Sequence, residues 1–410
     1  MGQEKLRKHL SMDALLLRVK NLFNTIPTPK RCEISTVDCL MSGLAVFGLK
    51  SASLLQFAEQ LKDQMLAANL KKLYGITQIP CDTQMRERLD VIKPDQIRPL
   101  FKQIFAQVQR AKLLESYQFL DGYYLLPIDG TEFFSSNEIH CDYCCTKNHK
   151  NGTTSFHHQA LGATIVHPNI PYVLPLMPEF ICKSDGDTKN DCERNAAKRL
   201  LEDVRREHPH LKLIVVEDAL YANGPHIKLL ESLNMRYIIV AKETDHDYMF
   251  KWVKDCELTQ HEEIEKGITH KFEFINEVPL NGTHHDLKVN FVRYTQIDKK
   301  GGTTTWTWVT NFIITTKNVY QIMQGGRARW HIENNTFNTL KNQGYNFEHN
   351  YGHGCKNLSN MMATLMFLAF FMDQIQLLIN DLFQAAKAKA RTYRILWEKM
   401  LHIMDFFSLR

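Results

Sequence analysis

Residues Tyr124-Leu125-Leu126-Pro127-Ile128-Asp129 form an apolar run that stops at a carboxylate, and this run indicates the class of fold. A second stretch of the same kind, Leu213-Ile214-Val215-Val216-Glu217-Asp218, lies further along the chain. Short apolar runs without alternation are typical of strands buried on both faces. We therefore expect two buried strands, one ending at Asp129 and one at Asp218. A carboxylate there needs a cation, a hydrogen-bond network or solvent, and capping of the next turn is the plain structural alternative.

The sequence around these two runs predicts further strands and helices. Apolar runs at 159–166 and 172–177 predict two more strands before an amphipathic helix over about 191–207. A helix over 225–233 and a short strand over 237–240 follow the second run. Three strands, helix, strand, helix, strand is the element order of an RNase H-like core. We therefore expect an α/β fold with a mixed RNase H-like sheet.

The remaining segments divide the chain into three predicted parts. Residues 10–118 have apolar residues at helical spacing, whereas residues from about 245 to 316 alternate as strands do. Helical patterns return at Val319 and continue to the C-terminus. The predicted domains are a helical DNA-binding region (1–119), a catalytic domain (120–375) with a β-rich insertion (about 245–316), and a C-terminal helical tail (376–410). The first part fits either a helix-turn-helix DNA reader or a purely structural bundle.

Charge is distributed unevenly along the chain. Residues 1–120 hold 18 Lys and Arg against 11 Asp and Glu, and residues 387–410 hold 6 against 2. The section between them holds 26 against 32. Basic ends around an acidic centre suit a DNA partner and divalent cations, although ordinary solvated helices give the same pattern.

Two segments bear on location. The N-terminal MGQEKLRKHL is charged and lacks a following apolar region, so we expect no secretory signal and a cytoplasmic, nucleoid-associated protein. The apolar run at 361–372 is only 12 residues long, which is too short for a membrane span. It is predicted to be a buried core helix, and no membrane partner is expected.

A third carboxylate, Glu333, lies in the helical segment Arg329-Trp330-His331-Ile332-Glu333. Trp330 and Phe337 are seven residues apart, so an α-helix would place them on one face and point Glu333 toward the core. Arg329 is four residues before Glu333 and can reach that carboxylate or a phosphate. Taken alone, such a pair is usually a surface salt bridge, and the three carboxylates together make the stronger signal.

Residues of roughly 120–375 resemble the bacterial insertion-sequence transposases with a DDE catalytic domain. The resemblance rests on IDGTEFFSS around Asp129, VVEDALYAN around Asp218 and RWHIENNTFNTLK around Glu333. It implies that Asp129, Asp218 and Glu333 hold two Mg²⁺ ions, which Mn²⁺ can replace, and that the protein cuts and joins DNA. It also implies the element's terminal inverted repeats and target DNA as partners, and a homodimer on paired ends.

The family's Glu region commonly has the pattern Tyr-x2-Arg-x3-Glu-x6-Lys, and this chain departs from it. Arg329 and Glu333 fit, but Gly326 stands at the Tyr position and Leu340 at the Lys position, with Lys341 one residue late. Arg329 and Lys341 are therefore DNA contacts to be tested. Two rival functions also stay open: an RNase H-like nuclease without strand transfer, and a DNA-binding protein that has lost catalysis.

Three weaker signals remain. Cys141 and Cys144 form a C-x-x-C with His149, His157 and His158 nearby, and because no second pair follows, free thiols are favoured over a structural zinc site. The acidic segment 179–193, including Asp185, Asp187, Asp191 and Glu193, suits helix capping or an accessory role near the metals. Trp306 and Trp308 share one face of a strand and either pack on the sheet or stack on a flipped base.

Overall fold

Parallel pairing of the two predicted strands organises the fold. The computed structural model describes residues 7–182, 192–282 and 287–408. Strand β1 (Tyr124–Ser136) pairs with β6 (Leu213–Glu217), with Leu126 opposite Val215 and Pro127 opposite Val216. The apolar side chains of both strands are buried, as their unbroken apolar sequence predicts. β1 is longer than expected, because it continues through Asp129 to Ser136 instead of ending at that residue.

A mixed sheet extends from this pair, so the α/β prediction is confirmed. On one side β3 (Thr154–His167) runs antiparallel to β1, and β2, β4 and β5 pair with β3. On the other side β7 runs parallel to β6. Helices α8 and α9 make the connections that parallel strands require. The elements not yet bounded are β2 (Cys145–Asn148), β4 (Ile170–Pro175), β5 (Glu179–Ile181), α8 (Glu193–Glu207), α9 (Gly224–Ser232) and β7 (Arg236–Val240).

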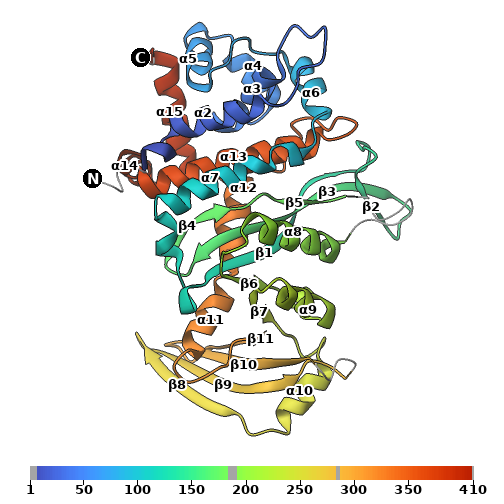
Figure 1. Ribbon diagram of the computed structural model, residues 1–410, viewed down its shortest axis with the longest axis vertical. Helices are drawn as coiled ribbons and strands as arrows, with labels where there is room; N and C mark the ends of the chain where they lie inside the picture. Colours follow the sequence, from blue (N-terminus) through green and yellow to red (C-terminus); the bar gives the residue numbers. More distant parts are fainter. Residues whose placement is uncertain (1–6, 183–191, 283–286, 409–410) are drawn as a thin grey trace.

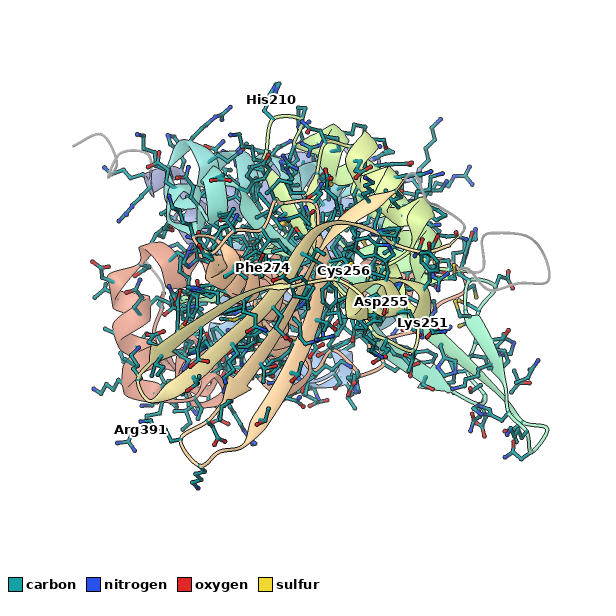
Figure 2. All side chains as sticks on the ribbon, turned by 90° about the horizontal axis from the view of Figure 1, so that it is seen from below. His210, Lys251, Asp255, Cys256, Phe274 and Arg391 are labelled. Carbon is teal, nitrogen blue, oxygen red and sulfur yellow. The ribbon has the colours of Figure 1, made fainter. Side chains whose placement is uncertain are left out.

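The predicted β-rich insertion extends the same sheet. Its last strand, β11 (Thr303–Thr310), pairs antiparallel with β7, so all the described strands form one 11-stranded sheet. The insertion also contains a helix that we did not predict, α10 (Asp247–Lys254), whose Met249, Phe250 and Val253 are buried at helical spacing. Seen from below, the insertion sheet covers that end of the molecule, with Phe274 near its middle and Lys251 on α10 beside it (Figure 2). Its other strands are β8 (Thr259–Glu265), β9 (Ile268–Pro279) and β10 (Lys288–Ile297).

Helices form the opposite end of the molecule, and both chain termini lie there (Figure 1). The described N-terminal elements are η1 (Lys8–Leu10), α2 (Met12–Phe23), α3 (Thr36–Gly48), α4 (Leu54–Gln60), α5 (Gln64–Tyr74), α6 (Asp82–Asp90), η2 (Pro94–Gln96), α7 (Arg98–Arg110), η3 (Leu113–Tyr117) and η4 (Leu120–Gly122). After the sheet come η5 (Ala219–Tyr221, between β6 and α9), α11 (Val319–Arg327), the π-helical turn η6 (Ile332–Phe337), α12 (Asn338–Asn342), α13 (Leu358–Ile379), α14 (Asp381–Ala390) and α15 (Tyr393–Phe406).

Helix α13 is the centre of this helical end. It is long and apolar enough to cross a membrane by length and composition, but 89% of its most apolar window is buried inside the protein. It packs against α3 and α6 from the N-terminal part of the chain and against β4 of the sheet. The predicted buried core helix is therefore confirmed, with more turns than the apolar run 361–372 indicated.

The two ends of the chain share this core. Lys50, two residues after α3, donates to Asp373 of α13 at 2.7 Å, and Asp373 also accepts from the Tyr345 hydroxyl at 2.6 Å. The Lys50 ammonium lies 4.3 Å from the ring centroids of Tyr345 and Trp397. A buried charge needs such partners. The segment after α3 and residues of α13 and α15 thus meet in one polar cluster.

Candidate active site

Strand pairing places Asp129 and Asp218 side by side. Pro127 and Val216 are the last paired residues of β1 and β6, and each aspartate follows two residues later. Because the strands are parallel, both carboxylates lie at the same edge of the paired region. Asp218 directly follows β6 and its Oδ1 accepts the Leu220 N–H at 2.9 Å, whereas Asp129 lies within β1, opposite Gly162 of β3. Asp218 thus acts as the turn cap considered as an alternative and still presents its second oxygen.

Glu333 is brought over the same strands by a close contact between a glycine and an aromatic ring. A Cβ at Gly162 would lie 2.9 Å from the Phe337 ring and 3.6 Å from Ile332. Such an approach requires glycine, because a side chain would push the ring away. Phe337 and Ile332 belong to the π-helical turn that carries Glu333. Gly162 therefore sets how closely the Glu333 segment approaches Asp129.

Arg329 joins two of the three carboxylates. Its Nη1 lies 2.8 Å from Oδ2 of Asp129, and its Nη2 lies 2.6 Å from Oε1 of Glu333. The side chains of Arg329 and Asp129 are largely buried, at 23% and 20% exposure, and Glu333 is 47% exposed. The expected contact of Arg329 with Glu333 is present, and the one with Asp129 was not foreseen because it spans 200 positions.

The environment changes the protonation of these groups. Burial raises the pKa of Asp129 to about 6, and Glu333 and Glu193 add to the shift while Arg329 opposes it. Burial disfavours the charged form of Arg329, yet Asp129 and Glu333 raise its pKa overall, with a contribution from Asp218. The cluster is thus an acidic site partly neutralised by one guanidinium.

A fourth carboxylate, Glu193, lies beside Asp129. A Cβ at Gly130 would come within 2.6 Å of its Oε2, and its Oε1 accepts the Tyr221 hydroxyl at 2.8 Å. Burial raises the pKa of Glu193, the Tyr221 hydrogen bond opposes this, and Asp218 and Glu217 add to it. Glu193 belongs to the acidic segment to which we gave either a capping or an accessory role. Asp185, Asp187 and Asp191 of that segment lie outside the described residues.

Sequence reasoning missed a buried pair behind Asp218. Glu217 is fully buried, and its Oε2 lies 2.7 Å from Nε2 of His226 on α9. Tyr221 packs on His226 with ring centroids 5.0 Å apart. The sequence does show a second acid, Glu217, directly before Asp218. Its pairing with His226 could not be predicted, because that pairing depends on how α9 packs against β6. The pair fixes the end of β6 from which Asp218 projects.

The prediction that Trp330 and Phe337 share a buried face is wrong. Trp330 is 46% exposed and Phe337 is 5% exposed, and Glu333 faces outward. The cause is the π-helical turn over Ile332–Phe337, which holds one residue more than an α-helical turn. Each residue of an α-helix turns by about 100°, so seven-residue spacing across this turn no longer returns to the same face.

The π-helical turn also accounts for Lys341, which comes one residue later than the lysine of the family pattern. Leu340, seven residues after Glu333, is fully buried, whereas Lys341, at eight, keeps 24% side-chain exposure and contacts Glu348 at 2.7 Å. One extra residue in the turn makes a spacing of eight equivalent to a spacing of seven in an α-helix. Lys341 therefore lies on the Glu333 face, where the family pattern has its lysine.

The two tryptophans differ in their surroundings. Trp308 is 1% exposed, and a Cβ at Gly326 would lie 2.7 Å from its ring, so Trp308 packs beneath α11 and cannot stack on a base. The prediction that Trp308 contacts DNA is therefore wrong, and Trp308 packs on the sheet instead. Trp306 is half-buried, with the Arg327 guanidinium 4.8 Å from its ring centroid. Its contact with DNA stays a prediction.

The three carboxylates suit hard divalent cations, which prefer oxygen ligands. Among residues 7–182, 192–282 and 287–408, however, these three carboxylates are not a group whose ligand atoms are already placed to hold one metal ion together. Arg329 lies between two of them and supplies positive charge there. The residues fit a cation site whose negative charge Arg329 partly neutralises.

Comparison with known proteins agrees with the motifs. A family model described as the transposase DDE domain matches residues 177–372. The match includes Asp218, Arg329 and Glu333, while Asp129 lies outside it. No curated protein matches the chain. Together with strand-end aspartates and a helical glutamate at one site, this match confirms the resemblance to the insertion-sequence transposases and identifies residues 177–372 as similar to the transposase DDE domain.

Proposed function

We propose that this protein is a transposase that holds two Mg²⁺ ions with Asp129, Asp218 and Glu333, cuts the ends of its element and joins their 3′-hydroxyl groups to target DNA. The observation that carries the proposal is the contact of Arg329 with both Asp129 and Glu333, next to Asp218 on the neighbouring strand. It unites residues from three separate motifs in one acidic site.

The sheet order supports an RNase H-like core for this site. β3 lies antiparallel beside β1, and β6 and β7 follow in parallel on the other side. Helix α8 precedes β6 and helix α9 precedes β7, in the predicted element order. In this proposal β8 to β11 are an insertion that lengthens the sheet beyond β7.

The carboxylates would hold the ions, and bound ions would activate the attacking hydroxyl and stabilise the leaving oxygen. Asp129 would share the ions with Asp218 of the neighbouring strand and with Glu333, which contacts the same Arg329. Arg329 competes with a cation for Asp129 and Glu333 in the metal-free protein. Once released, its guanidinium is placed to bind a DNA phosphate with two hydrogen bonds.

Lys341 and Trp306 are proposed as further DNA contacts. Lys341 lies on the Glu333 face beyond the π-helical turn, where its ammonium can exchange Glu348 for a phosphate. Trp306 is half-buried, and its ring contacts the guanidinium of Arg327, which ends α11 two residues before Arg329. Because two element ends must be held together before they are joined, we propose a homodimer on paired ends.

The test is cleavage of a DNA duplex that ends in the inverted repeats flanking the gene. We expect Mg²⁺-dependent cleavage that Asp129→Asn, Asp218→Asn and Glu333→Gln each abolish, while the exposed-residue control Asp255→Asn keeps it. Cleavage that survives one of the three changes would remove that residue from the site. Pre-cut ends with free 3′-hydroxyls separate the rivals, since a nuclease would not join them to target DNA and a silent protein would only bind.

A further inference from the structure

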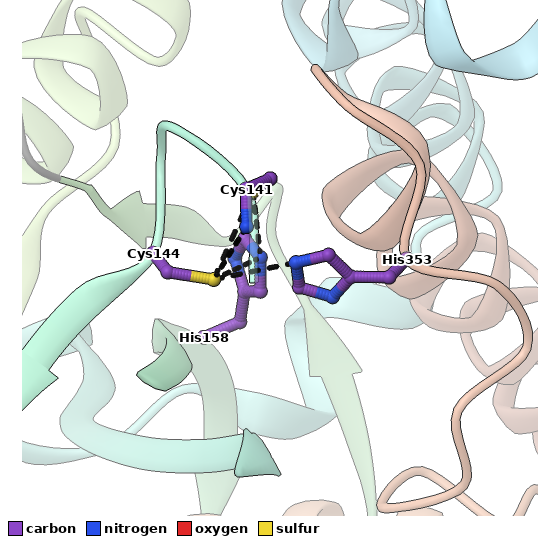
Figure 3. Close-up of side chains that lie close together, drawn as sticks. All are labelled: Cys141, Cys144, His158 and His353. Carbon is purple, nitrogen blue, oxygen red and sulfur yellow. Dashed lines mark hydrogen bonds between the residues drawn. The ribbon is translucent and has the colours of Figure 1, made fainter. Parts of the chain in front are cut away.

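Four metal-ligating side chains outside the candidate active site converge beside the β2–β3 hairpin. They are Cys141 and Cys144, which precede β2, His158 on β3, and His353 from the segment between α12 and α13 (Figure 3). Their ligand atoms all lie within 4.8 Å of one another. Among the described residues, no other group of three or more His, Cys, Asp or Glu side chains has this arrangement.

Four of the distances between these atoms are close to those of a tetrahedral metal centre. Cys141 Sγ and Cys144 Sγ are 3.8 Å apart, and His158 Nε2 lies 3.5 Å from the first and 3.4 Å from the second. His353 Nε2 lies 3.3 Å from Cys144 Sγ. A tetrahedral zinc ion, with Zn–S near 2.3 Å and Zn–N near 2.0–2.1 Å, separates two sulfur ligands by about 3.8 Å and sulfur from nitrogen by about 3.6 Å.

The site is enclosed by packed side chains. Cys144, His158 and His353 are 2%, 1% and 7% exposed. Phe134 packs on the His353 ring with centroids 4.5 Å apart, and Phe133 stacks on His158 at 5.8 Å. An apolar wall around two sulfurs and two imidazoles favours a closed site without a water ligand, as structural zinc sites have.

The backbone near His353 is built to present its ring. Gly352 and Gly354 flank it with φ of +127° and +67°, a region that favours glycine. A Cβ at Gly354 would lie 2.3 Å from Asp90 Oδ1. Asp90 in turn accepts the backbone N–H groups of residues 355–358 at the start of α13, at 2.9–3.0 Å. The turn is therefore fixed on both sides of the histidine.

We propose that Cys141, Cys144, His158 and His353 bind one structural Zn²⁺ ion. The ion would tie β3, which carries Gly162 opposite Asp129, to the chain that follows the Glu333 turn. His149 and His157 are not ligands: His149 contacts Ser155, and His157 contacts Ser155 and Glu132. The preference for free thiols is thus reversed, because the fourth ligand lies 209 positions after Cys144.

Thiolate and imidazole ligands in a tetrahedral set select zinc over Mg²⁺ or Ca²⁺, which take oxygen ligands. The proposal is independent of the active-site assignment, since the four ligands and the three carboxylates share no residue. Loss of zinc would weaken the fold near the hairpin, because metal binding stabilises the folded state.

The experiment is elemental analysis of the full chain purified without added metal. We expect about one zinc per chain, and a large loss of zinc in Cys144→Ser and His353→Ala. The matched controls Cys355→Ser and His149→Asn change neighbouring residues of the same types and should keep the zinc, as should Asp129→Asn. Less than about a tenth of an equivalent of zinc in the wild type, with none taken up from zinc solution, would overturn the proposal. Another metal in place of zinc, or a Cys141–Cys144 disulfide, would overturn it too.

A second variant covers the case in which His353→Ala does not fold. His353→Cys converts the set to three cysteines and one histidine, which is also a zinc-binding set. Cobalt exchanged for zinc should give the absorption of a tetrahedral thiolate centre in the wild type and a stronger thiolate-to-cobalt band in His353→Cys. An unchanged band in a folded His353→Cys would exclude residue 353 as a ligand and overturn the proposal.

Discussion

Arg329 and Asp129 are 200 positions apart in the chain, and their side chains meet at 2.8 Å. Arg329 also holds Glu333 at 2.6 Å, so one guanidinium neutralises two of the proposed metal ligands. A positive side chain at this position repels a cation and attracts a phosphate. Metal binding and DNA cleavage should therefore respond to it in opposite directions.

Arg329→Ala should bind Mn²⁺ about tenfold more tightly than the wild type and cleave DNA far more slowly. Removing the guanidinium ends its competition with the cation but also removes a phosphate contact. Calorimetric titration with Mn²⁺ and the cleavage assay measure the two effects. Arg394→Ala, which breaks an exposed pair with Glu398, is the control. Equal or weaker Mn²⁺ binding by a folded Arg329→Ala would contradict the competition.

Mn²⁺ affinity should fall as the pH drops through about 6, the pKa to which burial raises Asp129. Protons compete for the carboxylate, so the fall approaches tenfold per pH unit. For the metal-free protein the sign is opposite: a raised pKa gives stability that is complete below the usual 3.8 and is lost as the pH rises to about 6. Titration with Mn²⁺ between pH 5 and 8, and urea unfolding in EDTA, test both trends.

Glu193→Gln should shift the pH dependence of Mn²⁺ binding. Glu193 raises the pKa of Asp129, so removal of its charge shifts the midpoint of Mn²⁺ binding to lower pH. Glu138→Gln, the same change at an exposed residue, is the control. A midpoint that stays in place would exclude an electrostatic role for Glu193 at the site.

Gly162→Ala should lower the free energy of unfolding by about 1 to 3 kcal/mol, because the new Cβ would lie 2.9 Å from the Phe337 ring. Displacement of that ring moves the Glu333 turn away from Asp129, so DNA cleavage should fall more than stability alone explains. Gly282→Ala is the matched control, since its Cβ would make only ordinary contacts, the nearest at 3.6 Å. Denaturant unfolding and cleavage rates compare the two variants, and full cleavage activity in Gly162→Ala would refute this account.

Deletion of Asn334 should convert the π-helical turn into an α-helical one and keep the protein folded. Asn334 is exposed, and its side-chain amide donates to the carbonyl of Trp330, four residues earlier in the same helical segment, at 3.2 Å. The deletion leaves Lys341 on the Glu333 face at a spacing of seven, so DNA binding should be retained. Lys341→Ala should weaken DNA binding. It should also reduce the slope of the logarithm of the binding constant against the logarithm of salt concentration by about one unit. Loss of binding by a folded deletion variant would show that the extra residue serves another purpose.

Prediction from sequence succeeded where a local pattern decides the outcome. The unbroken apolar runs ending near Asp129 and Asp218 mark buried strands, and the i, i+4 spacing of Arg329 and Glu333 marks a helical pair. It failed where an irregular backbone intervenes. The π-helical turn has no clear sequence signal, and it reversed the expected faces of Trp330 and Glu333. Strand β1 passed beyond Asp129 because β3 continues to pair with it.

The strand cores, the chemistry of the three carboxylates and the family resemblance can therefore be predicted from the chain, because they depend on residue type and short spacing. Which distant groups meet depends on the folded arrangement. Arg329 reaches Asp129 because Gly162 lets Phe337 approach β3, and His353 completes the cysteine cluster because two glycines and Asp90 shape its turn. Such contacts depend on the packing of whole elements, which no local spacing encodes.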